Sequence, residues 1–249
     1  MKVKTILVSQ PAPQSETSPY FDLAEKQKVK IDFRPFIHVQ GVEVAEFRKQ
    51  KISLSDHSAI ILTSRNAVDH YFRMCKEMRF EVPADMKYFC MSEAIAYYLQ
   101  KYVVYRKRKI YYGKQTFAHL MDVIKKHKSE SFLLPSSDLL KAEIPNLLEK
   151  NKINYSRAIL YKTVCSDLSD LEDVYYDILV FFSPSGIKSL FQNFPEFEQK
   201  DTRIAVFGNT TTKAAEESGL KVNIKAPSVK APSMTMALDQ FIKEVNGKK

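Results

Sequence analysis

The sequence contains the same strand-to-helix corner twice, about 120 residues apart. The first copy reads ILTSRNAVDHY over residues 61–71, and the second reads FFSPSGIKSL over residues 181–190. In both copies an apolar strand ends in serine, a polar or proline-containing turn follows, and a small residue opens an amphipathic run. A chain that repeats this corner is expected to fold into two similar units.

Other positions repeat in the same order, with offsets of 117–122 residues: Ser64 and Ser183, Met91 and Gly208, Thr116 and Ser233, Ile31 and Ile153. The repeat is one of pattern, because the literal identity between the halves is low. We therefore predict an internal duplication of about 120 residues.

Short apolar runs alternate along the chain with helical runs of period 3.6, which is typical of parallel sheets covered by helices. The predicted strands cover residues 5–9, 31–39, 59–64, 88–91, 109–112, 132–135, 155–164, 178–183, 203–207 and 222–225. The fold class is thus α/β: two similar domains, each a parallel sheet flanked by helices, joined by a two-stranded linker with a cleft between them. Residues 31–40 and 155–165 are the expected linker strands, because they are long and lie at equivalent points of the repeat.

Motifs of several enzyme classes are missing from the sequence. The six glycines form neither G-x-G-x-x-G nor a P-loop, and the five histidines form no H-E-x-x-H. The three cysteines lie far apart without a C-x-x-C pair. These observations disfavour a disulfide framework, a zinc site and a metal- or nucleotide-dependent enzyme. No apolar run approaches the roughly 18 residues of a membrane span, and we expect a cytoplasmic protein without a membrane partner.

The net charge of +9 favours an anionic partner, either a nucleic acid, an acidic membrane surface or a polyanionic small molecule. The densest basic run covers residues 106–109. Such a run is usually a solvated strand edge or turn, and a nucleic-acid site would recruit more of the surface. We therefore expect no nucleic-acid partner, and salt-dependent retention on DNA or RNA would contradict this.

Hydroxyl, amide and small residues gather where strands are followed by helices. There the free N–H groups and the positive end of the helix dipole suit a carboxylate or phosphate. Simple N-capping explains any single corner, but five together indicate an extended polyanion site. The five corners are Ser64-Arg65-Asn66, Ser92-Glu93, Ser136-Ser137-Asp138, Ser183-Pro184-Ser185-Gly186 and Gly208-Asn209-Thr210-Thr211-Thr212.

Three segments, FFSPSG, GNTTTKAAEESGL and AILYKTV, together resemble the uroporphyrinogen-III synthase family, the cyclases of tetrapyrrole biosynthesis. The resemblance extends over essentially the whole chain. It implies one discontinuous domain made of residues 1–34 and 166–249, and a second domain of residues 39–160. It also implies a polycarboxylate tetrapyrrole substrate, hydroxymethylbilane, with no cofactor and no metal. We expect a monomer.

The resemblance also implies site residues. Tyr161 matches the family's cleft tyrosine, which is placed to help the substrate hydroxyl depart. The expected substrate-binding residues are Ser64, Arg65, Asn66, Ser92, Ser136, Ser183, Ser185, Gly186, Gly208, Thr210 and Thr211. Two positions depart from the family pattern, Gln10 where an arginine is common and Met91 where a glycine is common. The alternative is a non-catalytic, two-lobed anion-binding receptor, which would show the same corners.

Overall fold

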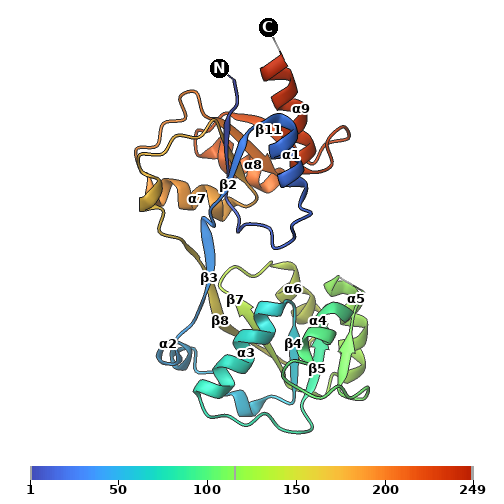
Figure 1. Cartoon of the computed structure of the whole chain (residues 1–249). Coiled ribbons are helices and arrows are strands. Elements are labelled where there is room, and N and C mark those ends of the chain that lie inside the picture. The colour runs from blue at the N-terminus through green and yellow to red at the C-terminus, as the bar shows by residue number, and fades with distance from the viewer. Residues whose placement is uncertain (1, 115, 248–249) are drawn as a thin grey trace. The chain divides into compact units, whose positions relative to one another are not determined.

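The computed structural model describes residues 2–114 and 116–247 (Figure 1), and its contacts divide the chain into two units. Unit 1 comprises Met1–His38 and Val164–Lys249, and unit 2 comprises Val39–Thr163. Each unit is a parallel sheet flanked by helices, so the predicted fold class of two similar α/β domains is confirmed. The domain limits expected from the resemblance, 1–34 plus 166–249 and 39–160, stay a prediction.

Unit 2 is built on a six-stranded sheet of order β3-β8-β7-β4-β5-β6. Its strands are β3 (Ile37–Gly41), β4 (Ala59–Leu62), β5 (Lys87–Cys90), β6 (Ile110–Tyr112), β7 (Phe132–Ser137) and β8 (Tyr155–Cys165). All four residues of β4 are buried, as expected of a central strand whose two faces are covered. Strands β8, β7, β4, β5 and β6 run parallel.

The helices of unit 2 cover both faces of this sheet. They are α2 (Val44–Lys49), α3 (Arg65–Glu77), α4 (Glu93–Leu99), α5 (Phe117–Ile124) and α6 (Glu143–Lys150), with short 3₁₀ turns at Leu54–Asp56 and Lys125–His127. Helices α3 and α4 pack on one face in a core with Leu62 and Leu160. Helices α5 and α6 pack on the other face around Phe132 and Leu134.

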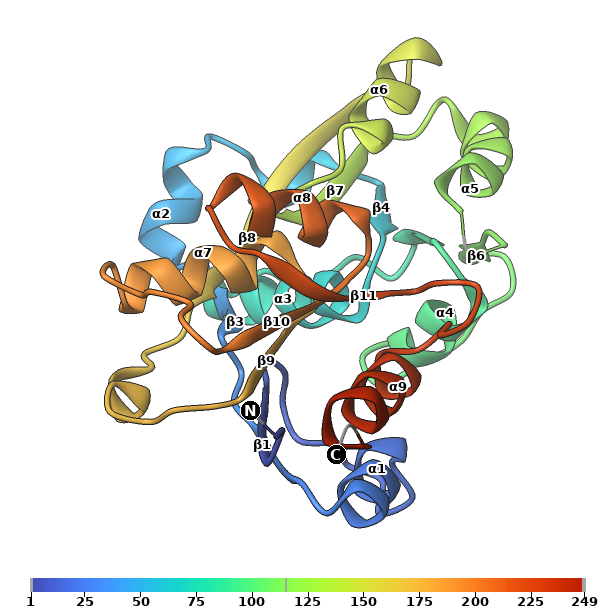
Figure 2. The same cartoon turned by 90° about the horizontal axis from the view of Figure 1, so that it is seen from above.

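Unit 1 is built on a five-stranded parallel sheet of order β11-β10-β9-β1-β2. Strands β11, β10, β9 and β1 are labelled in Figure 2, and β2 is labelled in Figure 1. Its strands are β1 (Thr5–Val8), β2 (Lys30–Phe33), β9 (Ile178–Phe181), β10 (Arg203–Phe207) and β11 (Val222–Ala226). Its helices are α1 (Pro19–Gln27), α7 (Pro184–Asn193), α8 (Asn209–Glu217) and α9 (Met234–Gly247), with a 3₁₀ turn at Ser169–Leu171. Helices α1 and α9 cover one face, and α7 and α8 cover the other.

The two sheets share one strand order. Strands β8-β7-β4-β5-β6 of unit 2 correspond to β2-β1-β9-β10-β11 of unit 1, and α3 and α4 correspond to α7 and α8. Strand β1, near the beginning of the chain, therefore lies between β2 and β9 as β7 lies between β8 and β4 in unit 2. The first two strands and the first helix of the chain complete a sheet whose other three strands come from beyond residue 177.

The prediction of one long strand over residues 31–39 was wrong. The segment forms two strands, β2 and β3, interrupted at Arg34-Pro35-Phe36. Pro35 has no N–H group to donate to a sheet. The Phe36 carbonyl accepts the Ser166 N–H at 2.9 Å, and its ring is 2% exposed. The buried ring and the bond to Ser166 hold this break in place.

Within the described residues, no helix is long and apolar enough to cross a membrane.

Candidate functional site

The first corner of unit 2 lies between β4 and α3. Ser64 is extended (φ −156°, ψ 166°), and its Oγ accepts the Ala67 N–H at 3.1 Å, so it is the N-cap of α3. The apolar residues of α3 face the core at helical spacing. Arg65 and Asn66 are exposed in the first helical turn. The corner thus presents free N–H groups and one cationic side chain to solvent.

Tyr161 lies in β8 beside this corner. Its hydroxyl is 3.2 Å from Ser64 Oγ, and the residue is 7% exposed. Burial raises the pKa of the phenol, while the hydrogen bond with Ser64 lowers it. The group therefore stays protonated at neutral pH and can donate a proton. The sequence pointed to both residues separately, and the structure brings them together.

Sequence reasoning missed His70 and Arg73, which follow Ser64 on α3. The His70 ring stacks on the Tyr161 ring, with centroids 4.9 Å apart and an interplanar angle of 18°. Arg73 Nε donates to His70 Nδ1 at 3.2 Å. The available signal was the spacing of His70, Arg73 and Glu77, which places the three on one helical face.

The Arg65 guanidinium lies over the ring of Tyr98, 5.3 Å from its centroid. The neighbouring carboxylate, Asp69, accepts hydrogen bonds from the hydroxyls of Tyr98 and Tyr102 at 2.8 and 2.5 Å, and Lys101 lies 3.9 Å away. Among the described residues Arg65 has no ion pair. Its charge is therefore available to an anion, because Asp69 is engaged elsewhere.

The other two corners predicted in unit 2 fit an anion site less well. Ser92 is the N-cap of α4, but its side chain makes no capping bond, and the exposed Glu93 follows it. The predicted corner at Ser136 was wrong in its geometry: β7 continues to Ser137, and α6 begins only at Glu143. Ser136 is 1% exposed and accepts a hydrogen bond from Arg157 Nε at 3.0 Å.

The equivalent corner of unit 1 joins β9 to α7. Ser183 is extended (φ −153°, ψ 153°), and its Oγ accepts the Gly186 N–H at 3.2 Å. Ser185 is half-buried and Gly186 is buried. A Cβ on Gly186 would contact Phe181 Cδ1 at 3.4 Å, so the helix start fits closely against its strand.

The second corner of unit 1 joins β10 to α8. Gly208 has φ +85° and ψ 152°, a conformation available essentially to glycine alone. Thr210 is exposed in the first turn of α8, whereas Thr211 is 1% exposed. Thr211 therefore offers its backbone N–H to this corner, and its side chain belongs to the packing beneath it.

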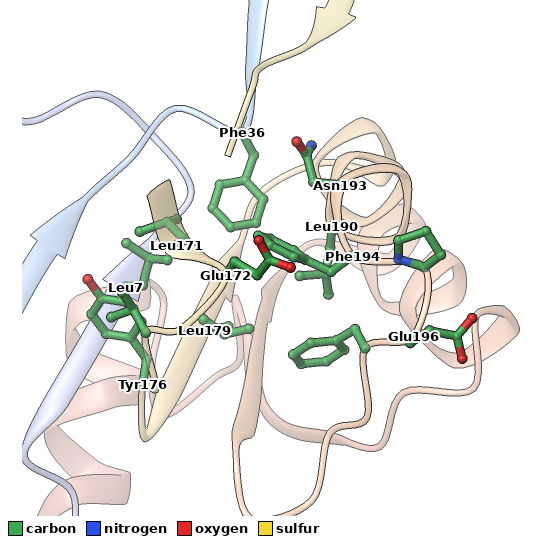
Figure 3. Close-up of a pocket in the computed structure, with 13 residues that line it drawn as sticks. Leu7, Phe36, Leu171, Glu172, Tyr176, Leu179, Leu190, Asn193, Phe194 and Glu196 are labelled. Carbon is green, nitrogen blue, oxygen red and sulfur yellow. The ribbon is translucent and has the colours of Figure 1, made fainter. Parts of the chain in front are cut away.

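A cavity of about 420 Å³ lies elsewhere in unit 1 (Figure 3). Leu7, Phe36 and Leu179 form part of its apolar wall, near the C-terminal end of α7. Its charged lining residues are Glu172 and Glu196. Ser183 lies at the opposite end of the same helix, and the carboxylates would repel an anion, so the cavity is separate from the candidate site.

Over the described part of the chain, no group of three or more His, Cys, Asp or Glu side chains could hold a metal ion.

Comparison with known proteins adds an independent line of evidence. The family model described as "Uroporphyrinogen-III synthase HemD" matches residues 18–236. A stretch of 124 residues, 47% of this chain, is 29% identical to the uroporphyrinogen-III synthase of Chlorobaculum parvum. That stretch spans 50% of the relative's length.

Two solved structures share the fold. The uroporphyrinogen-III synthetase of Helicobacter pylori 26695 has a TM-score of 0.59 at 18% identity, covering 97% of this chain and 100% of the other. A substituted uroporphyrinogen III synthase of Thermus thermophilus has a TM-score of 0.53 at 16% identity, covering 99% and 100%. At such low sequence identities, the structural similarity shows a shared fold only.

Proposed function

Because the chain belongs to the uroporphyrinogen-III synthase family, we propose that it is the cyclising lyase of tetrapyrrole biosynthesis that acts on hydroxymethylbilane. The product would be uroporphyrinogen III, formed with inversion of ring D and loss of water. The observation that carries the proposal beyond family membership is the pair of Tyr161 and Ser64, a protonated phenol held at a helix N-terminus.

The reaction begins when the C–O bond at the ring A end breaks. The pyrrole nitrogen supplies the electron pair, and the hydroxyl accepts a proton and leaves as water. We assign the donation of that proton to Tyr161, with Ser64 orienting the phenol. The resulting carbon electrophile is attacked by ring D to give a spiro intermediate, which opens and closes again with ring D inverted and a ring proton lost.

The carboxylates of the substrate need fixed donors, because the chain is flexible and ring D has to turn. We assign this to N–H groups and side chains at the helix starts, with Arg65 as the cationic partner in unit 2. The proposed binding residues of unit 2 are Ser64, Arg65, Asn66 and Ser92. Ser136 is left out, because it is buried and its hydroxyl is bound by Arg157. Those of unit 1 are Ser183, Ser185, Gly186, Gly208, Thr210 and Thr211.

We further propose that the protein works as a cytoplasmic monomer without a nucleic-acid or membrane partner. The basic run at residues 106–109 supports the absence of a nucleic-acid partner, because it lies in the segment that precedes the short strand β6 and Lys109 Nζ donates to the Ala84 carbonyl. Such a contact is typical of a structural turn. Light scattering on the purified protein tests the oligomeric state.

The decisive experiment is incubation with freshly prepared hydroxymethylbilane followed by separation of the product isomers. A synthase yields the type III isomer faster than the spontaneous type I product appears. The rival function, an anion-binding receptor without catalysis, predicts that only type I forms at the spontaneous rate. Heat-denatured protein at the same concentration gives the reference for that rate.

A further inference from the structure

We propose that His70 is a positioning residue for Tyr161, and that Arg73 holds His70 in the orientation this requires. The inference rests on the proposed function, since it gives the tyrosine a task. It concerns residues of α3 and β8 within unit 2.

The first step is the way in which Tyr161 is held. Its hydroxyl contacts Ser64 at one end, and its ring lies nearly parallel to the imidazole of His70. The ring is also packed into the core of unit 2. The stacked imidazole restricts its orientation further, because such an aromatic pair contributes about 0.5–1.5 kcal/mol beyond its buried area.

The second step fixes the protonation state of His70. Arg73 Nε carries a hydrogen and donates it to His70 Nδ1 at 3.2 Å. Nδ1 must therefore be an acceptor, and the neutral ring carries its hydrogen on Nε2. A protonated imidazole could not accept this bond and would lie beside the guanidinium charge. Burial of the ring and the neighbouring Arg73 charge thus both favour the neutral imidazole, against the opposing effect of Asp69 and Glu77.

Arg73 itself is held in place by hydrogen bonds to the backbone and by an ion pair. Its Nη2 donates to the carbonyls of Val42 and Leu160 at 2.8 and 3.1 Å, and its Nη1 pairs with Glu77 at 2.8 Å. Leu160 immediately precedes Tyr161, so the same guanidinium holds the backbone that carries the phenol. Gly41 makes room for it, since a Cβ there would lie 2.8 Å from Arg73 Cζ.

The contact can be tested in the free protein by ¹⁹F NMR on a sample labelled with 3-fluorotyrosine. The resonance of Tyr161 is assigned as the one missing from Tyr161→Phe. We expect His70→Ala to shift it, because the ring current of the imidazole is lost. His70→Phe should keep a stacked ring, and Gly41→Ala should shift the resonance by displacing Arg73 without altering a polar side chain.

Kinetics on unlabelled protein supply the second readout. We expect His70→Ala to lower kcat by roughly 3- to 10-fold, in line with the loss of one aromatic pair, with KM nearly unchanged. His70→Phe should restore the rate to within about 2-fold. His119→Ala, on an exposed histidine of α5, is the matched control and should leave both readouts unchanged.

Two results would overturn the inference. One is a His70→Ala protein whose Tyr161 resonance and kcat both equal those of the parent. The other is a folded His70→Phe protein as impaired as His70→Ala, which would give the role to the ring nitrogens. If the parent protein forms no type III product, the proposed function fails, while the ¹⁹F shifts still decide whether His70 holds Tyr161.

Discussion

The corners at the start of α3 and of α7 use one backbone arrangement for two different chemical environments. In each, an extended serine caps the helix by accepting the N–H three residues ahead, from Ala67 in one unit and from Gly186 in the other. Beside Ser64 lie a phenol and an imidazole. At the α7 corner, the side chains within 4 Å of a Cβ placed on Gly186 are those of Phe181, Ser183 and Ser9.

The C-terminal parts of the two helices differ in the same way. Arg73 of α3 binds the carbonyls of Val42 and Leu160 through a charged fork. Asn193 of α7 binds the carbonyl of Ser166 at 3.0 Å through a neutral amide, at a similar place in its unit. Both helices thus bind backbone carbonyls of their own unit, α3 through a charged group and α7 through a neutral one. We infer that both corners bind substrate groups, whereas the proton chemistry is confined to the α3 corner.

We expect the largest effect from Gly208→Val. The equivalent position of unit 2 is Met91, so this change tests whether the unit 1 corner depends on glycine where the unit 2 corner has a side chain. We expect the loss of about 1–3 kcal/mol of folding free energy, because the φ of +85° strains any other residue. Displacement of the helix start should lower the rate of type III formation by more than about 100-fold. Denaturant unfolding and isomer analysis measure the two effects.

Gly219→Val is the matched control for this change. Gly219 also has a positive φ, +79°, with open space around it, and follows α8 instead of preceding it. We expect Gly219→Val to lower the folding free energy by a comparable amount and to leave the rate of type III formation per folded molecule unchanged. Full activity in a folded Gly208→Val protein would remove this corner from the binding site.

Tyr161→Phe tests whether proton donation resides in unit 2. We expect type III formation to slow by roughly 10- to 100-fold, in line with partial loss of general-acid catalysis. Tyr155→Phe is the control in the same strand, since that hydroxyl contacts Glu149 at 3.2 Å, outside the corner. An unchanged rate in Tyr161→Phe would exclude the phenol from the mechanism.

Ser64→Ala and Ser183→Ala together sharpen the comparison. Each removes a capping bond and should cost about 1 kcal/mol of stability. Of the two serines, only Ser64 contacts Tyr161. We therefore expect Ser64→Ala to slow turnover roughly 2- to 10-fold more than Ser183→Ala does. Equal rates in the two proteins would show that the Ser64–Tyr161 contact has no catalytic effect. Complete inactivity of a folded Ser183→Ala protein would contradict the assignment of substrate binding to many groups at several helix starts.

The smallest expected effect is a difference in acid sensitivity between the units. Burial lowers the pKa of His57, His70 and His127, all of which lie in unit 2, and the Arg73 charge adds to the effect at His70. The unfolded chain then binds more protons than the folded one as pH falls below about 6.5. Stability that is present above this pH is progressively lost below it.

Amide hydrogen exchange at about pH 7.5 and about pH 5.5, corrected for intrinsic rates, tests this. Protection in unit 2 should fall more than in unit 1 over this interval. The carboxylates with lowered pKa, Glu130, Asp167 and Asp239, titrate at more acidic values and do not contribute here. An equal loss of protection in both units would contradict the prediction.

The corners and the parallel sheets could be predicted because their causes are local. A serine before an amphipathic run is an N-cap wherever it occurs, and four consecutive buried apolar residues such as those of β4 form a central strand. The repeat then placed Ser64 and Ser183 at equivalent points. The sequence therefore indicated both corners, but not their contacts.

The remaining features depend on partners distant in sequence. Nothing near His70 shows that its ring stacks on Tyr161, because that contact arises only when α3 packs against β8. Ser136 read as a corner because three polar residues follow an apolar run, yet Arg157 from the neighbouring strand binds it inside the sheet. Pro35 alone could have indicated a break in the predicted strand over residues 31–39. The apolar residues on both sides of it favoured one continuous strand instead.

The internal position of β1 in its sheet determines the order in which the units can assemble while the ribosome is making the chain. Strand β1 pairs with β2 on one side and with β9 on the other, and β9 begins only at Ile178. All of unit 2, Val39–Thr163, is synthesised in this interval and can fold as one continuous segment. A lone pair of strands is marginally stable in water and has an open edge. We therefore expect residues 1–38 to remain without their full sheet until β9 has been synthesised, although unit 2 has already folded. Nascent-chain chaperones would then bind this segment.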